Sequence, residues 1–124
     1  MTGATILVVD DHPLNLALLE HLLTIDGYRV RTAADADSAV ASIDEVRPDL
    51  ILMDLQLPGV DGFELTRRLK ARPDLAGVPV VAVTSYAMSG DEVRARAAGC
   101  DGYLSKPIEA ATFPTLVEQF LAGR

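Results

Sequence analysis

The feature that most constrains this sequence is a set of short aliphatic runs without a polar residue inside them. They read ILVV at 6–9, LILM at 50–53 and VVAV at 80–83. A strand with one face in water alternates apolar and polar residues, whereas a continuous run indicates a strand that is buried on both faces. Strands of that kind belong to parallel sheets that helices cover on both sides. The runs therefore predict an α/β fold.

Amphipathic segments alternate with these runs and predict the helices. Strands are expected at 5–10, 28–34, 49–54, 78–84 and 102–105. Five helices are expected. The first runs from Pro13 to Gly27, the second from a cap at Asp35 to about Val46, and the third begins after a cap at Asp61. The fourth runs from a Ser89/Glu92 capping box to Gly99, and the fifth ends at about Leu121. This order predicts a doubly wound, five-stranded parallel sheet of the (βα)5, flavodoxin-like type, with strand order 2-1-3-4-5.

The start of the last helix is left open by Pro114. If the helix begins just after Glu109, Pro114 lies beyond the first turn and removes an internal hydrogen bond. The alternative is a helix that starts at Phe113 with Thr112 as its cap. On the first helix, we expect Leu16 and Leu19 to take part in an exposed apolar stripe, although core packing accounts for some of the leucines there.

Length and composition restrict the class of protein. A chain of 124 residues fits a single domain, so we expect residues 1–124 to form one unit. The formal net charge of -7 argues against direct nucleic-acid binding. Cys100 is the only cysteine, which excludes an internal disulfide and fits a reducing cytoplasm, and we expect it to be half-buried without a redox role. The apolar runs are too short to span a membrane.

Acidic residues follow two of the predicted strands. Asp10 and Asp11 end the first strand, and Asp54 ends the third. In a doubly wound sheet the first and third strands flank the point where strand order reverses, and ligands bind there. A single Asp at a strand end is equally well explained as a turn residue. Three carboxylates that converge repel one another unless a cation is bound, and oxygen ligands of this kind suit Mg²⁺.

Two further strand ends face these acids in the predicted fold. Thr84 ends the fourth strand and Lys106 ends the fifth. Lys106 could serve as a structural partner of Asp10, but its position opposite the acids favours a functional role. His12 could also reach a metal ion, but its place beside Pro13 at a helix start favours a surface position.

Four segments together resemble the CheY-like response-regulator receiver domains over essentially the whole chain. They are ILVVDD (6–11), DLILMDLQLPGVDG (49–62), VPVVAVTSYA (78–87) and AGCDGYLSKPI (98–108). The stretches HPLNLALLEHLL (12–23) and AMSGDE (87–92) are most similar to two subgroups. One comprises free-standing receivers of the DivK type, and the other comprises receivers of hybrid histidine kinases. The boundaries of the sequence favour a free-standing domain, although a fragment of a hybrid kinase would look the same.

This resemblance implies a phosphoacceptor switch of a bacterial two-component phosphorelay. Asp54 would accept the phosphoryl group from a phosphohistidine, and Lys106 would contact the phosphoryl oxygens. Mg²⁺ would be held by Asp11, Asp54 and the backbone carbonyl of Gln56, with Asp10 acting mainly through a water. Thr84 and Tyr103 would form the conformational switch. Without the resemblance, Tyr103 is explained as a half-buried tyrosine on an edge strand.

The same resemblance implies the partners and the lifetime of the signal. The partners would be a histidine kinase or a histidine phosphotransferase protein, and a downstream target that binds the face formed by the fourth helix, the last strand and the last helix. Ser85, Tyr86 and Pro107 would neighbour the phosphoryl group. Because Gln56 and the bulky Tyr86 supply no carboxylate that positions water, we expect slow autodephosphorylation rather than enzymatic turnover.

Two other classes of protein share part of this pattern. A phosphatase of the haloacid-dehalogenase type also uses a nucleophilic Asp at a strand end, but it needs a second Asp two residues later, where this chain has Gln56. A flavodoxin-like binder needs a Ser/Thr-rich phosphate loop after the first strand, where this chain has Asp-Asp-His-Pro at 10–13.

Overall fold

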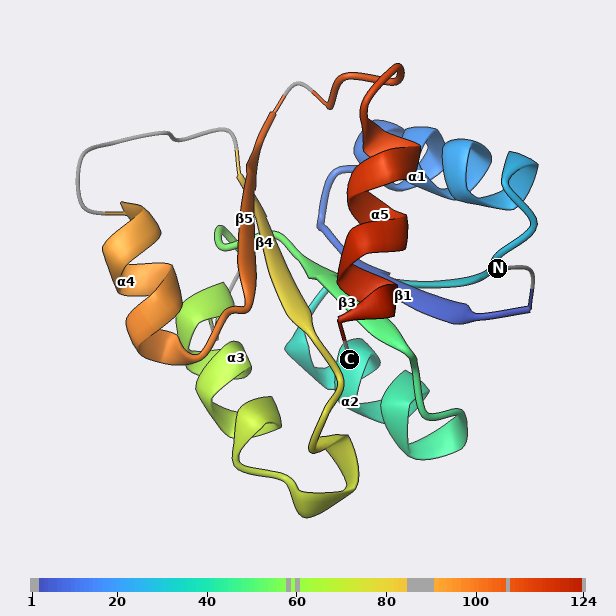
Figure 1. The fold of residues 1–124 in the computed structure, drawn as a ribbon. Helices are drawn as coiled ribbons and strands as arrows, with labels where there is room; N and C mark the ends of the chain where they lie inside the picture. Colours follow the sequence, from blue (N-terminus) through green and yellow to red (C-terminus); the bar gives the residue numbers. More distant parts are fainter. Residues whose placement is uncertain (1–2, 58, 60, 85–90, 107, 124) are drawn as a thin grey trace.

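A five-stranded parallel sheet forms the centre of the protein (Figure 1). The computed structural model describes residues 3–57, 59, 61–84, 91–106 and 108–123. The strands are β1 (Thr5–Val9), β2 (Arg29–Ala33), β3 (Leu50–Met53), β4 (Val80–Thr84) and β5 (Gly102–Ser105). They pair in the order β2-β1-β3-β4-β5, and every pairing is parallel. The predicted fold class and strand order are therefore confirmed.

Helices cover both faces of the sheet (Figure 1). They are α1 (Pro13–Ile25), α2 (Ala36–Glu45), α3 (Gly62–Lys70), α4 (Asp91–Ala98) and α5 (Phe113–Ala122), with a short 3-10 helix, η1 (Pro73–Leu75), before β4. Helices α1 and α5 lie on one face, whereas α2, α3 and α4 lie on the other. Among the described residues, none of these helices is long and apolar enough to cross a membrane.

The core consists of two layers because side chains alternate along each strand. In β1, Leu7 and Val9 belong to the layer under α2, α3 and α4, whereas Ile6 and Val8 belong to the layer under α1 and α5. All residues of β1, β3 and β4 are buried. The continuous aliphatic runs therefore reflect burial on both faces, as the sequence predicts.

Capping side chains fix the starts of α2 and α3. Asp35 accepts a hydrogen bond from the N–H of Ser38 at 2.8 Å, and the Ser38 hydroxyl receives the N–H of Asp35 in return. Asp61 accepts one from the N–H of Glu64 at 2.9 Å. Both predicted caps are therefore confirmed. They satisfy helix N–H groups that have no partner within the helix. The predicted cap of α4, Ser89, lies outside the described residues.

Helix α5 begins at Phe113, so Pro114 lies in its first turn. There the missing proline N–H removes no helical hydrogen bond. Of the two predicted starts, the structure has the later one. Thr112 occupies the cap position but makes no capping hydrogen bond with its side chain. Its hydroxyl instead contacts the carbonyl oxygen of Glu109 at 3.4 Å.

The exposed apolar side chains of α1 form a stripe that differs from the predicted one. Leu19 is 2% exposed and packs in the core, and Leu16 is partly buried against the same layer. The exposed side chains are Leu14, Leu18 and Ile25, at 85%, 46% and 67%. The placement of Leu19 was wrong because α1 turns Leu19 toward the sheet, which leaves the opposite side of the helix in solvent. We call Leu14, Leu18 and Ile25 the α1 stripe.

Candidate functional site

The residues predicted for the site gather at the carboxyl ends of the strands, and the backbone fixes them there. Asp10 and Asp54 each extend a strand pairing by one hydrogen bond: Asp10 N–H donates to Ala33 at 3.0 Å, and Asp54 N–H donates to Val9 at 2.9 Å. Lys106 N–H donates to the Thr84 carbonyl at 2.7 Å in the same way. Because these bonds continue the ladders between strands, the site residues are as firmly placed as the sheet itself.

The carboxylates of Asp10 and Asp54 are buried, with 2% and 3% exposure. Each uses its Oδ1 to accept a backbone N–H two residues later, from His12 at 2.8 Å and from Gln56 at 2.9 Å. Each then turns its Oδ2 toward Lys106, whose Nζ donates to Asp10 at 2.7 Å and to Asp54 at 3.2 Å. The structure therefore brings two predicted carboxylates, those of Asp10 and Asp54, onto the ammonium group of a third predicted residue, Lys106.

Burial and neighbouring charges shift the pKa values of Asp54 and Lys106. Burial raises the pKa of Asp54, and the Asp10 charge adds to that effect, although the Gln56 N–H and the Lys106 ammonium oppose it. Burial works to lower the pKa of Lys106, but the hydrogen bond to Asp10 and the charges of both carboxylates outweigh it and raise the pKa. The raised pKa of Lys106 keeps its ammonium charged, and the raised pKa of Asp54 shows that burial outweighs its contacts with the Gln56 N–H and Lys106.

The donor set fits a divalent cation. Oxygen atoms of Asp10, Asp11 and Asp54, together with a nitrogen of His12, lie within 4.8 Å of one another. Oδ1 of Asp11 is buried and accepts no hydrogen bond within the described part of the chain, although His12 Nδ1 lies 3.2 Å from it, at ion-pair distance. A buried carboxylate oxygen that accepts no hydrogen bond is costly, and a bound cation removes that cost. Carboxylate oxygens at this density are the ligands that Mg²⁺ takes.

Thr84 and Tyr103 lie on neighbouring strands near the carboxylates. Thr84 is 1% exposed and is the last residue of β4. Tyr103 is half-buried on the edge strand β5 and pairs with Ala82, two residues before Thr84. Side chains two residues apart share a sheet face, so Thr84 and Tyr103 are on the side of α4. The predicted phosphoryl-site neighbours Ser85, Tyr86 and Pro107 lie outside the described residues.

The packing of Gly62 was missed by reasoning from the sequence, and the contact of His12 with the acids was considered and disfavoured. Gly62, at the start of α3, backs directly onto the chain that carries Asp54, and a Cβ there would lie 2.4 Å from the Asp54 carbonyl oxygen. The only indication of this packing in the sequence was that a glycine directly follows the predicted helix cap Asp61. His12 has a side chain that is 66% exposed, as expected, yet its Nδ1 lies 3.2 Å from Asp11 Oδ1 and 3.4 Å from Asp10 Oδ1.

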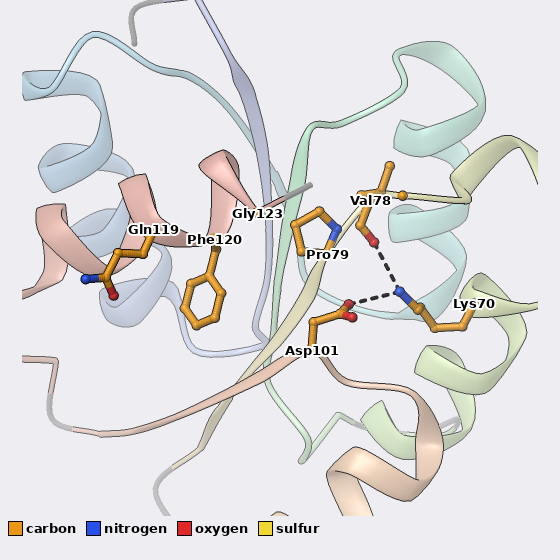
Figure 2. Close-up of a pocket in the computed structure, with 8 residues that line it drawn as sticks. Lys70, Val78, Pro79, Asp101, Gln119, Phe120 and Gly123 are labelled. Carbon is orange, nitrogen blue, oxygen red and sulfur yellow. Dashed lines mark hydrogen bonds and ion pairs between the residues drawn. The ribbon is translucent and has the colours of Figure 1, made fainter.

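A surface pocket of about 420 Å³ lies at the opposite end of the sheet (Figure 2). Lys70 enters it from α3, and its Nζ donates to Asp101 at 2.9 Å and to the Val78 carbonyl at 3.3 Å. The Lys70 charge is therefore already paired there. Ligands of doubly wound sheets bind beyond the carboxyl ends of the strands, and this pocket is at the amino ends of β4 and β5. It is therefore no part of the candidate site.

Cys100 is buried rather than half-buried as predicted. Its Sγ lies 3.9 Å from the Thr66 hydroxyl, and burial raises the pKa of the thiol. A thiol that is buried and protonated reacts poorly. The expectation that Cys100 takes no part in redox chemistry therefore has a physical reason.

Fold and site together define a doubly wound α/β domain with a cluster of carboxylates and a lysine at the carboxyl ends of its strands, and comparison with known proteins identifies the family. The sequence pattern of the response regulator receiver domain matches residues 6–118. The chain belongs to the response-regulator receiver family, whose members are phosphoacceptor switches of two-component signalling. The polar-differentiation response regulator DivK of Brucella anthropi is 42% identical over 117 residues, which cover 94% of this chain and 95% of DivK.

Solved structures agree with this assignment. One of them is the receiver domain of a sensor histidine kinase from Pseudomonas aeruginosa PAO1, which was solved with a magnesium ion coordinated in its active-site cleft. It superimposes with a TM-score of 0.88 at 37% identity, and the match covers 98% of this chain and 99% of that chain. The chemotaxis protein CheY4 of Vibrio cholerae gives a TM-score of 0.90 at 28% identity, covering 96% and 99%. The predicted CheY-like, DivK-type family is therefore confirmed.

Proposed function

We propose that Asp54 is the residue that accepts the phosphoryl group. The observation that carries this proposal is the pairing of a buried Asp54 carboxylate with Lys106 Nζ at 3.2 Å, beside a second carboxylate that holds the same ammonium. A carboxylate of this kind is held in place by its Gln56 N–H contact, but its charge is only partly neutralised. It therefore presents Oδ2, beside the Lys106 ammonium, at the carboxyl end of β3.

The transfer is an in-line displacement at phosphorus. An oxygen of Asp54 forms a bond to the phosphorus of a phosphohistidine, the P–N bond breaks, and the imidazole leaves with the electron pair and takes up a proton. Asp54 then carries an acyl phosphate. Lys106 neutralises charge on the phosphoryl oxygens, because its ammonium already lies between Asp10 and Asp54. In phosphoryl transfer, such positioning and charge stabilisation supply nearly all of the catalysis.

Residues Asp10, Asp11 and Asp54 and the carbonyl of Gln56 are proposed to hold Mg²⁺, with Asp10 acting mainly through a water. Oδ1 of Asp11, which is buried and accepts no hydrogen bond among the described residues, supports this assignment. When bound, Mg²⁺ supplies positive charge that offsets the repulsion between the carboxylates and the incoming phosphoryl group. Gln56 contributes backbone groups here, and no second acid stands two residues after Asp54, which disfavours a phosphatase of the haloacid-dehalogenase type.

Thr84 and Tyr103 are proposed to read out the modification. Thr84 is buried at the end of β4, and Lys106 is tied to its carbonyl by a 2.7 Å hydrogen bond. A phosphoryl group on Asp54 adds acceptor oxygens that attract the Thr84 hydroxyl, and movement of that side chain opens space for Tyr103 on the same sheet face. The covalent group thereby favours one of two conformers. The output surface is proposed to consist of α4, β5 and α5.

The upstream partner is proposed to be a histidine kinase or a histidine phosphotransferase protein. The α1 stripe supports this, because Leu14 begins it only three residues after Asp11 and is 85% exposed. An exposed apolar strip beside a charged site is suited to docking a helical partner. We further propose that residues 1–124 act as one receiver domain in the cytoplasm, and that slow autodephosphorylation ends the signal.

Exposure to a small phosphodonor such as acetyl phosphate with Mg²⁺ tests the proposal. Intact-protein mass spectrometry should show one added phosphoryl group on the wild-type chain and none on Asp54→Asn. Replacement of Lys106 by Met should slow the modification strongly while leaving the fold measurable by circular dichroism. Sustained turnover of phosphomonoesters, or modification that survives in Asp54→Asn, would contradict the assignment.

A further inference from the structure

The side chain of His12 is placed differently from that of an ordinary residue at the start of a helix. His12 is the cap residue of α1, a position where Ser, Thr, Asp or Asn normally accepts a helix N–H. It makes no capping hydrogen bond with its side chain. Its Nδ1 instead faces the carboxylates of Asp10 and Asp11. The imidazole is therefore directed into the acidic site rather than onto its own helix.

The backbone holds His12 in that place. Its N–H donates to Asp10 Oδ1 at 2.8 Å, and Pro13 follows it at the first position of α1, which restricts the chain. The remainder of the imidazole lies in solvent, since the side chain is 66% exposed.

The distances between these atoms match those between ligands of one small cation. Nδ1 of His12 lies 3.2 Å from Oδ1 of Asp11, which is a direct ligand in the proposed site, and 3.4 Å from Oδ1 of Asp10, which acts there mainly through a water; both separations are also those of an ion pair. Two ligands that bind one ion at about 2.1 Å each lie about 3.0–3.4 Å apart when the angle at the ion is about 90–109°. Asp54 completes the set, because its ligand oxygen lies within 4.8 Å of the other ligand atoms.

A nitrogen ligand changes which ions a site prefers. Mg²⁺ takes oxygen ligands and binds imidazole poorly, whereas Co²⁺, Ni²⁺ and Zn²⁺ bind imidazole well. An oxygen set formed only by Asp10, Asp11 and Asp54 discriminates weakly against Mg²⁺. The same set with one imidazole nitrogen gains affinity for the later first-row ions without losing its oxygen ligands.

We propose that His12 Nδ1 is a direct ligand of the cation in this site and makes the site favour transition-metal ions such as Co²⁺ over Mg²⁺. The inference rests on the proposed cation site of Asp10, Asp11 and Asp54. It adds a ligand that the predicted set of carboxylates and the Gln56 carbonyl does not contain. In a cell that supplies such ions, His12 would allow the site to be loaded by an ion other than Mg²⁺.

Titration calorimetry of the wild-type chain, His12→Ala and His21→Ala with Co²⁺ and with Mg²⁺ tests the inference. His21 is the matched control, because it is the other histidine of the chain and is exposed on α1 away from the carboxylates. The ratio of Co²⁺ to Mg²⁺ affinity should fall at least tenfold in His12→Ala and stay at the wild-type value in His21→Ala.

Proton NMR of the Co²⁺-loaded protein gives an independent measurement. The wild type and His21→Ala should show strongly shifted imidazole ring signals, and His12→Ala should lack them; His12→Gln provides a second variant with a polar side chain of similar length. An unchanged affinity ratio in His12→Ala, or the absence of shifted imidazole signals in the wild type, would overturn the role of His12 while Mg²⁺ still binds. Failure of both ions to bind the wild type would instead overturn the cation site itself.

Discussion

Gly62 is the residue whose replacement should disturb the site most from outside it. It begins α3, and its N–H donates to the Leu55 carbonyl at 3.1 Å. A Cβ on Gly62 would lie 2.4 Å from the Asp54 carbonyl oxygen and 2.5 Å from the Leu55 Cα. Favourable contacts between heavy atoms lie at about 3.5–4.0 Å, so Gly62→Ala overlaps the backbone by about 1 Å.

Two opposing effects set the size of the change. Alanine gains up to about 1 kcal/mol over glycine from helix propensity. Overpacking costs about 1–3 kcal/mol, and the upper part of that range applies because the atoms that must move are backbone rather than the end of a side chain. We expect a net loss of about 1–2 kcal/mol in the free energy of unfolding. For a domain of this size the midpoint of thermal unfolding should fall by about 4–8 °C.

Two other glycines provide matched controls. A Cβ on Gly123, at the end of α5, would lie 3.5 Å from its nearest neighbour, which is an ordinary contact. A Cβ on Gly102 would lie 2.4 Å from the ring of Phe120, but that ring borders the pocket of Figure 2 and can turn into it. The expected order of destabilisation is therefore Gly62→Ala, then Gly102→Ala, then Gly123→Ala with almost none.

Urea unfolding and phosphorylation by acetyl phosphate measure both consequences of Gly62→Ala. Because the overlap displaces the backbone of Asp54, the rate of phosphorylation should fall several-fold at a temperature where the variant is still folded. The Gly123→Ala rate should equal the wild-type rate. A Gly62→Ala variant that unfolds and is phosphorylated as Gly123→Ala does would refute the claim that close packing behind Asp54 positions the nucleophile.

Three further predictions concern charge and the α1 stripe. Because burial raises the pKa of Asp54, ionised Asp54 lowers stability at neutral pH. Asp54→Asn should therefore raise the free energy of unfolding at pH 7 by more than the ~0.5 kcal/mol scatter of ordinary surface substitutions. Urea titrations at several pH values should show this gain shrinking as the pH falls through the raised pKa of Asp54. Lys106→Met leaves Asp10 and Asp54 without their shared cation and should cost about 3 kcal/mol at pH 7. Since the pKa of Lys106 is raised, its contribution is complete below its ordinary value of 10.5 and should be lost only as pH rises through the raised value. Leu19→Ala should lower the free energy of unfolding by about 2–5 kcal/mol, because Leu19 is buried in the core. Leu14→Ala should change it by less than about 0.5 kcal/mol but should slow phosphotransfer from a histidine-containing partner. Equal effects of the two variants in both assays would contradict the assignment of the α1 stripe.

The central strands were predictable because continuous aliphatic runs indicate burial on both faces, and the strand order followed from the regular alternation of strands and helices. The caps Asp35 and Asp61 were equally visible, since a capping carboxylate needs only its own position and an N–H three residues later. Strand ends were predicted slightly too long. Asp49 and Asp54 flank β3 rather than belong to it, and their carboxylates bind the N–H groups of Thr5 and Gln56.

Other parts of the site depend on contacts that sequence patterns do not contain. The direction of the His12 imidazole depends on its side-chain rotamer, whereas the sequence indicates only that His12 could reach a metal ion. The role of Gly62 depends on how closely α3 approaches β3. The rotation of α1 about its axis decides that Leu19 is buried and Leu14 is exposed, and the dense leucines of that helix allow more than one rotation.

The central claim is that Asp54 is the nucleophile. Phosphorylation with acetyl phosphate and Mg²⁺, followed by borohydride reduction, converts an aspartyl phosphate to homoserine, which peptide mass spectrometry locates. The account predicts homoserine at position 54 alone, and none after the same treatment without phosphodonor. Homoserine at position 10 or 11, or a phosphoryl group on a hydroxyl side chain with position 54 unmodified, would contradict it.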